Sequence, residues 1–466
     1  MLVLAAVVLL VAGSLPRYPG SLWVLVAFHL AFFVLAILAV LPPYVDAYVF
    51  LTGFMVLGFW VKLMAHLLLG FRFAEPVGAF DYSPAQWDRA LTAAAAAAAG
   101  AALFRLGYLL AVRRKVVGDA PPSAGPGWYH GRPVEIWALA AFLTLILYLV
   151  NFRFAFFQIG VVPKLTLPPG LNAVVAWMVF AGGPLAWTLL AEWELARRPE
   201  RFAPLVWSVC LLALVASVST ASRGTTIFLF AAYGCALALH RPGQLRKLVQ
   251  TWRWRLPVVL TATLALSLTL VSVFRMTTYV LPRGTLDGNE MARQVLTLPV
   301  ARWVGLEGLL SVSASTQRSL ALLVEGIRED PKRGVHSIYQ KLAGSPYEAR
   351  DGFIYLTLPG APAILYYSGS VAIVLAGMCF FTAALTAVEA LAARVTSSRF
   401  LVALLGVLTA NAVSQMSFPY LWMVFMAETL VALGAFALVQ SALRLAWRQG
   451  GVRHKGNPLK PFTGRE

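Results

Sequence analysis

The sequence lacks the short motifs that hold nucleotides and metal ions in many enzymes. It contains no DxD pair, no HExxH and no phosphate-binding loop of the form GxxxxGK[ST]. A metal-bound nucleotide sugar and an ATP site therefore have no support from the sequence. We expect no cofactor and no metal ion.

Cysteine and charge are also scarce. Cys210, Cys235 and Cys379 all lie in apolar runs, where they behave as small hydrophobic residues and give neither a disulfide framework nor a metal-ligand spacing. Charged residues make up 12% and hydrophobic residues 59% of the 466 residues, whereas soluble globular chains carry about 25% charged residues. This composition excludes a soluble globular protein.

Long apolar runs recur along the whole chain at helix length, and strand-length alternation is absent, which argues against a membrane β-barrel. The predicted fold class is all-α, a polytopic transmembrane helix bundle of about twelve spans. The first run lacks a basic n-region and a cleavage site, so we interpret it as a short span and not as a signal peptide. The spans are predicted at residues 2–13, 22–41, 47–70, 91–112, 135–151, 171–193, 203–220, 225–240, 257–274, 364–390, 400–416 and 420–441.

The net charge of +18 is concentrated in short basic segments between these runs and in the tail at 443–466. Under the positive-inside rule such segments mark cytoplasmic loops, so we expect no nucleic-acid partner. With twelve spans both termini lie inside, and residues 71–90, 221–224 and 275–363 lie outside. The chain 1–466 is then a single integral membrane domain with a basic cytoplasmic tail.

The outward segment 275–363 is the only long polar insertion, and loops of this length usually have a function or are disordered. Its composition favours order. Ser315 is predicted to cap a helix that runs to about Glu329. Residues 298–310 carry enough apolar side chains for a helix that lies on the membrane or dips into it. We therefore expect one large, partly helical external loop.

Arg223 is the only charged residue in the apolar stretch from Phe202 to Leu239. An arginine in hydrocarbon costs roughly 2.5 to 3.5 kcal/mol even on a lenient insertion scale, so Arg223 belongs at a tight break between two spans, at headgroup depth. Arg275 and Arg302 likewise lie beside apolar segments without an adjacent acid. Because a guanidinium binds phosphate oxygens bidentately, we expect these three arginines to bind a lipid diphosphate.

Three further arginines in the outward segment, Arg283, Arg293 and Arg318, more simply form salt bridges with acidic residues of the same loop. Two ionisable residues lie within predicted spans. Lys62 and Glu428 come to similar depths of roughly 12 Å below the outer ends of their helices. They could pair, and the sequence leaves open whether such a pair is structural or functional.

Transfer to an acceptor hydroxyl needs a base within hydrogen-bond reach. The sequence does not choose among the outward acids and the one histidine of the large loop, which are Glu75, Asp81, Asp88, Glu307, His336, Glu348 and Asp351. Four outward aromatic residues could stack on sugar rings, although interfacial aromatic belts explain most such residues without a ligand. They are Tyr82, Trp87, Trp303 and Tyr339.

Three short motifs and their order give a family resemblance. Ser222-Arg223-Gly224 lies between two short spans, Arg302-Trp303-Val304-Gly305 lies in the large loop, and Pro359-Gly360 precedes Tyr366-Tyr367-Ser368-Gly369 and Gly377. From about residue 200 to 420, this layout resembles the bacterial O-antigen or oligosaccharide repeat-unit polymerases of the Wzy type.

The resemblance implies a GT-C-like glycosyltransferase of the bacterial inner membrane, active at the periplasmic face. Such enzymes move a growing glycan from one undecaprenyl diphosphate carrier onto the non-reducing end of a second carrier-linked unit. The partners would be the lipid-linked oligosaccharide, the bilayer and a chain-length regulator. Arg223 and Arg302 match the arginines that hold the donor diphosphate, and His336 is the only counterpart of an external-loop histidine. With Glu307 they form the predicted catalytic set.

Two alternatives remain. O-antigen ligases share the architecture but transfer the glycan to lipid A-core. A flippase for lipid-linked oligosaccharides would also have about twelve helices, but it has no use for so large a structured loop, and no paired half-repeats are visible in the sequence.

Overall fold

The computed structural model describes residues 2–42, 44–112, 127–165, 167–198, 202–275, 300, 303–346 and 356–450. These residues form helices joined by short loops, and this part of the chain contains no β-strand, so the all-α class is confirmed. A helix satisfies its own backbone hydrogen bonds, as a chain in lipid must. Nine of the described helices are long and apolar enough to cross a membrane, which indicates a multi-pass membrane protein.

These nine helices lie close to predicted spans. They are α2 (Leu22–Ala39), α3–η2–α4 (Asp46–Leu69), α5 (Pro84–Ala111), α7 (Pro133–Phe154), α8–η3–α9 (Gly170–Arg197), α10 (Ala203–Thr220), α13 (Arg255–Arg275), α19 (Val371–Val395) and the apolar part of α21 (Pro419–Ala442). Shorter apolar helices occupy the other predicted positions. They are α1 (Leu2–Ser14) with η1 (Leu15–Arg17), α11 with η4 (Gly224–His240) and α20 (Arg399–Ser414). Two short helices, α6 (Gly127–Gly131) and α12 (Pro242–Trp252), lie between spans.

The centre of the bundle is built on small residues of α5. Helix α5 packs against both α2 and α19, and its residues Ala93, Ala97 and Gly100 are buried. A methyl group on Gly100 would lie 2.2 Å from the Leu375 carbonyl oxygen of α19. Small side chains let helix backbones approach closely, which is how helices associate in lipid.

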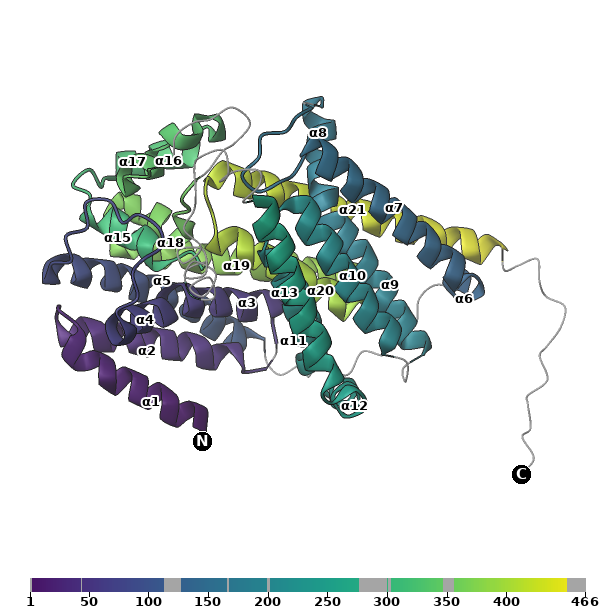
Figure 1. Cartoon of the computed structure of the whole chain (residues 1–466), viewed down its shortest axis with the longest axis horizontal. Helices are drawn as coiled ribbons and strands as arrows, with labels where there is room; N and C mark the ends of the chain where they lie inside the picture. Colours follow the sequence, from purple (N-terminus) through teal and green to yellow (C-terminus); the bar gives the residue numbers. More distant parts are fainter. Residues whose placement is uncertain are drawn as a thin grey trace.

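A group of short helices follows the largest gap in the described chain and forms a cap over one end of the bundle. Figure 1 places the cap at the upper left and the basic helix α12 at the opposite, lower edge. The cap helices are α15 (Leu306–Ala314), α16 (Leu320–Arg328), η7 (Pro331–His336), α17 (Ile338–Ala343), α18 (Gly360–Leu365) and η8 (Tyr366–Ser368).

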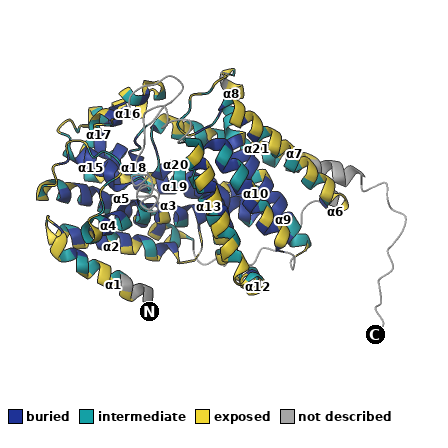
Figure 2. Ribbon diagram, in the orientation of Figure 1, coloured by how far each residue is buried: buried dark blue, intermediate teal, exposed yellow. Residues whose placement is uncertain are grey.

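The two helices predicted in this segment form with shifted bounds. α15 is buried over almost its whole length, in keeping with a segment that dips into the bundle (Figure 2). The predicted cap residue of the next helix is wrong, because Ser319 and not Ser315 accepts the hydrogen bond from the Leu322 amide. Ser315 instead ends α15, so α16 begins later than the sequence suggested.

Candidate functional site

The break between α10 and α11 brings together two of the predicted diphosphate arginines. Ala221 has a φ of 51°, so the chain turns within the few residues between the helices. At the end of α13, Arg275 donates from Nε and Nη2 to the Ala221 carbonyl oxygen, at 3.0 and 2.8 Å. Its guanidinium thus binds the chain two residues before Arg223, which occupies the N-cap position of α11. The amides of a helix N-terminus favour an anion at the same place.

A polar network fixes the shape of this break. The Asn151 side-chain amide donates to the Ser219 carbonyl oxygen at 2.9 Å and accepts from the Phe157 amide at 2.8 Å. The Ile159 amide donates to the Thr220 carbonyl oxygen at 2.9 Å. Asn151 of α7 and Ile159 of the loop after α7 therefore satisfy carbonyl groups that the end of α10 leaves open.

A chain of hydroxyl groups joins the three helices around the break. Thr226 lies 2.9 Å from the Ser217 hydroxyl of α10 and donates to the Ser267 hydroxyl of α13, also at 2.9 Å. All three side chains are buried. Hydrogen bonds of this kind hold helices in register within lipid, so the backbone on which Arg223 and Arg275 stand is fixed.

The start of the cap reaches toward the same break through aromatic rings. Trp303 packs on Phe54 of α3, with ring centroids 5.9 Å apart, and Phe54 packs on Phe228 of α11 at 5.7 Å. Phe228 lies one turn of helix after Gly224. Arg302, the third predicted arginine, lies outside the described residues. Its neighbour Trp303 is separated from Phe228 of α11 by the ring of Phe54.

Lys62 pairs with a residue of the cap. Its Nζ lies 2.5 and 2.6 Å from the two carboxylate oxygens of Glu307, and both side chains are almost fully enclosed. The predicted partner Glu428 is therefore wrong. Depth along the spanning helices does not reveal Glu307, because α15 enters the bundle from the external segment and brings a carboxylate to Lys62.

This pairing gives Glu307 a structural partner. Both carboxylate oxygens of Glu307 contact the Lys62 ammonium, and the side chain is almost fully enclosed, so an acceptor hydroxyl has little access to it. In this conformation Glu307 is unsuited to act as the base, although it was a member of the predicted catalytic set. Its catalytic role stays a prediction that the geometry does not favour.

The four predicted glycan-stacking residues divide into two kinds. Trp87 is 1% exposed and lies in an aromatic cluster with His66 and Phe80, and Tyr339 of α17 is buried within the cap. Neither offers a ring face to a sugar. Tyr82 is 47% exposed, and Trp303 is partly exposed, so these two keep ring surface for a ligand.

His336 is exposed in η7, and no contact within the described residues joins it to Arg223 or Arg275. Nearby, Glu329 is buried and accepts a hydrogen bond from the Ile338 amide at 2.7 Å. Burial raises the pKa of the Glu329 carboxyl above its ordinary value of 4.5. Glu329 is a titratable group of the cap that the sequence analysis did not single out.

The remaining acids and arginines have local roles or lie outside the described residues. Asp88 accepts hydrogen bonds from the Tyr18 hydroxyl and the Ser21 amide, at 2.8 and 2.9 Å. Arg318 donates to the Ser315 carbonyl oxygen and to the Tyr366 hydroxyl, so its predicted acidic partner is wrong. The candidates outside the described residues are Glu348, Asp351, Arg283 and Arg293.

A second polar cluster lies at the other end of the bundle, and the sequence analysis missed it. Asp46 at the start of α3 lies 3.0 Å from the His240 imidazole. The Glu389 carboxylate accepts from the amides of Asp46 and Ala47, at 2.9 and 2.7 Å, and so caps α3. The sequence feature that could have indicated this cluster is the presence of isolated acidic residues inside apolar runs.

The same end holds a buried arginine–glutamate pair. Arg241 pairs with Glu192 of α9, and the Ser398 hydroxyl donates to the other oxygen of Glu192. Arg105 of α5 donates to the carbonyl oxygens of Leu38 and Leu41, at 3.2 and 2.7 Å. The guanidinium thereby binds the carbonyl groups that the end of α2 leaves open.

Over the described residues, no group of three or more histidine, cysteine or acidic side chains is arranged to hold a metal ion. Comparison with known proteins gives no family model, no curated protein and no solved structure that matches the chain.

Proposed function

We propose that this protein is a glycosyltransferase of the bacterial inner membrane that polymerises undecaprenyl-diphosphate-linked oligosaccharide units at the periplasmic face. The observation that carries the proposal is the meeting of Arg275 with the α10–α11 break beside Arg223. Positive charge at a fixed helix break between apolar helices suits a diphosphate whose lipid tail lies in the bilayer.

The proposal takes all twelve apolar helices as spans of one GT-C-like bundle. The break at 221–223 and the cap then lie on the periplasmic side, and α12, with Arg246 and Lys247, lies in the cytoplasm with the tail at 443–466. The positive-inside rule supports this orientation.

In the proposed reaction an acceptor hydroxyl attacks the anomeric carbon of the donor glycan. The new glycosidic bond forms as the bond from that carbon to the diphosphate oxygen breaks, and the acceptor proton passes to a base. Arg223 and Arg275 would neutralise the departing diphosphate, and each charge-assisted hydrogen bond is worth about 1.5 to 3 kcal/mol. Since Glu307 is paired with Lys62, the exposed His336 is the better candidate base.

A deletion strain tests the function and separates it from ligation. Loss of a polymerase leaves single repeat units attached to lipid A-core, whereas loss of a ligase leaves lipid A-core bare while polymer collects on the carrier lipid. We expect single units, and restoration of long glycan by the intact gene. A strain without the gene that still makes long glycan would refute the proposal.

A transporter of the same lipid-linked glycan is the second candidate. The buried acids Asp46 and Glu192 and the half-buried Glu389 at the far end of the bundle favour it, because ionisable groups within spans often mark translocation paths. In that case the deletion strain would hold lipid-linked units only at the cytoplasmic face, where an enzyme added to the outside of spheroplasts could not reach them.

A further inference from the structure

Helix α16 of the cap has apolar side chains on two different faces. On the inner face, Leu323 and Gly326 are buried, and a methyl group on Gly326 would lie 2.9 Å from the Tyr367 ring. On the outer face, Leu320, Val324 and Ile327 are 61%, 40% and 42% exposed. Their spacing of four and three residues makes one continuous stripe along the helix. The packing of the cap does not account for this stripe.

The position of α16 indicates what covers the stripe. The helix packs against α21, near whose start Tyr420, Leu421 and Met423 are exposed. In a spanning helix, exposed apolar side chains face lipid. The Ser319 amide also donates to the Tyr367 carbonyl oxygen at 2.8 Å, which ties α16 to the entry of α19. Helix α16 therefore lies beside the ends of two apolar helices, close to the exposed apolar residues at the start of α21.

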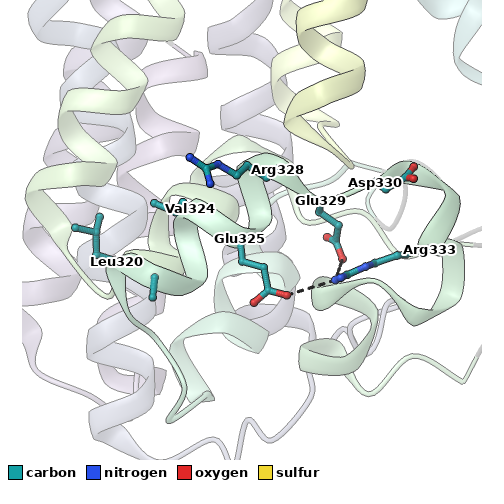
Figure 3. Close-up of a pocket in the computed structure, with 8 residues that line it drawn as sticks. Leu320, Val324, Glu325, Arg328, Glu329, Asp330 and Arg333 are labelled. Carbon is teal, nitrogen blue, oxygen red and sulfur yellow. Dashed lines mark hydrogen bonds and ion pairs between the residues drawn. The ribbon is translucent and has the colours of Figure 1, made fainter.

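Charged residues border the stripe. Arg333 lies 3.3 Å from Glu325 and 3.7 Å from Glu329, so these three charges are satisfied among themselves. Arg328 is exposed and has no ion pair within the described part of the chain; in Figure 3 it is directed away from this network, on the side of Val324.

A groove of about 710 Å³ runs along this face, with Leu320 and Val324 on its apolar side and the ion-pair network on the other. An apolar wall beside a guanidinium that is not ion-paired suits an amphiphile with a phosphate headgroup.

We propose that α16 is an interfacial helix that seats the cap on the bilayer. The stripe of Leu320, Val324 and Ile327 lies among acyl chains at the membrane surface, and Arg328 binds the phosphate of an anionic phospholipid. The proposal rests on the chain being a membrane protein and does not depend on glycosyl transfer. The cap is then held at a fixed height above the bilayer.

Depth measurements on the full chain in lipid vesicles test the apolar part of the proposal. In a background with Cys210, Cys235 and Cys379 changed to alanine, Val324→Cys carries a fluorophore, and Lys332→Cys, exposed just beyond α16, carries the same label as a control. Phospholipids brominated on their acyl chains should quench the label at 324 strongly and the label at 332 weakly. Equal, weak quenching at both positions would overturn the proposal.

Hydrogen exchange tests the phosphate contact. Amides of 320–328 should exchange more slowly in vesicles that contain phosphatidylglycerol than in phosphatidylcholine alone. Arg328→Gln should weaken the phosphatidylglycerol effect about fivefold, the factor expected for one basic side chain at an anionic surface, and Lys332→Gln should change it less. Leu320→Ser with Val324→Ser should lose the protection in both lipids.

Both serine substitutions are at exposed positions, so the melting temperature in detergent should remain that of the parent. The proposal fails if free inorganic phosphate reproduces the phosphatidylglycerol effect, because the site would then recognise the anion and not the membrane. It also fails if Arg328→Gln leaves the effect unchanged.

Discussion

The Lys62 ammonium and the Glu307 carboxylate lie 2.5 Å apart although the residues are 245 positions apart in the chain. Their contact anchors α15 of the cap inside the bundle, against the helix that contains α4. With side-chain exposures of 3% and 4%, neither charge has access to water. The pair thus fixes where the cap begins, and Trp303 lies four residues before Glu307.

Removing one member of this pair should destabilise the protein severely. Lys62→Met or Glu307→Gln leaves a buried group without its partner, which typically costs about 3 to 5 kcal/mol. Thermal unfolding in detergent measures the loss. The double variant Lys62→Met/Glu307→Leu should recover much of the stability, because no charge is left unpaired. Single variants that melt with the parent would mean that the pair is not formed.

The backbone contact beside the pair predicts a sharp difference between two glycines of one helical stretch. A methyl group on Gly58 would lie 2.2 Å from the Val304 carbonyl oxygen, whereas a methyl group on Gly53 meets nothing within 4 Å. Gly58→Ala should therefore cost about 1 to 3 kcal/mol or more through overpacking. Gly53→Ala should be neutral or stabilising, as expected for glycine in a helix. Equal melting temperatures for the two variants would contradict the close approach of Val304, just before α15, to Gly58.

Arg275 should be needed for both stability and turnover. Arg275→Gln removes the charged donors to the Ala221 carbonyl oxygen, a loss of about 1.5 to 3 kcal/mol, and loosens the break on which Arg223 stands. Arg153→Gln, at an exposed arginine in the last turn of α7, is the matched control and should have little effect. Melting temperature and glycan length are measured together. A stable Arg275→Gln protein would show that the break holds its shape without this contact.

The cap should lose stability as the pH rises. The folded-state pKa of Glu329 lies above 4.5 because burial disfavours the charged carboxylate. The folded state therefore binds the proton more tightly than the unfolded state. The contribution of Glu329 to the stability of the cap is fully present below the pKa of the carboxyl in the unfolded state. It is lost as the pH rises through the higher pKa of the folded state.

Amide exchange in residues 329–338 should accordingly speed up beyond the intrinsic chemical rate as the pH rises from below 4.5 through the raised pKa of Glu329. Glu329→Gln should flatten this dependence. Glu325→Gln, at an exposed position, should not. A dependence that survives in Glu329→Gln would assign the effect to another group.

The sequence predicted the class and the helix positions because apolar runs of helix length leave few other structures in lipid. It also predicted that Arg223 lies at a break between two apolar helices, because a charge in hydrocarbon is costly, and Arg223 is the N-cap residue of α11. Neither the length of an apolar run nor the cost of a charge in lipid indicates which other residue a side chain will contact. Nominal depth therefore points from Lys62 to Glu428, whereas the true partner is Glu307 of the external segment.

Like the Lys62–Glu307 pair, the contacts of Arg275 with Ala221 and of Glu389 with Asp46 depend on how the helices pack and not on local sequence. No local pattern indicates that Arg275 reaches Ala221, since the contact follows from the packing of α13 against α10. Trp87 and Tyr339 are residue types that often stack on sugar rings, but they are buried because α5 and α17 turn them inward. Asp46 and Glu389 are single acids in apolar runs, and their proximity depends on α19 lying beside α3.

The most direct test of the proposed function is glycan synthesis by the purified protein from lipid-diphosphate-linked repeat units, with Arg223→Lys, Arg223→Ala and the control Arg153→Ala compared at equal amounts of folded protein. Lysine keeps the charge but lacks the bidentate fork, so Arg223→Lys should lose most of the activity and Arg223→Ala nearly all, about 2 to 4 kcal/mol in activation free energy. The parent and Arg153→Ala should give a ladder of long glycans. Long glycan from folded Arg223→Ala, or none from the parent, would contradict the account.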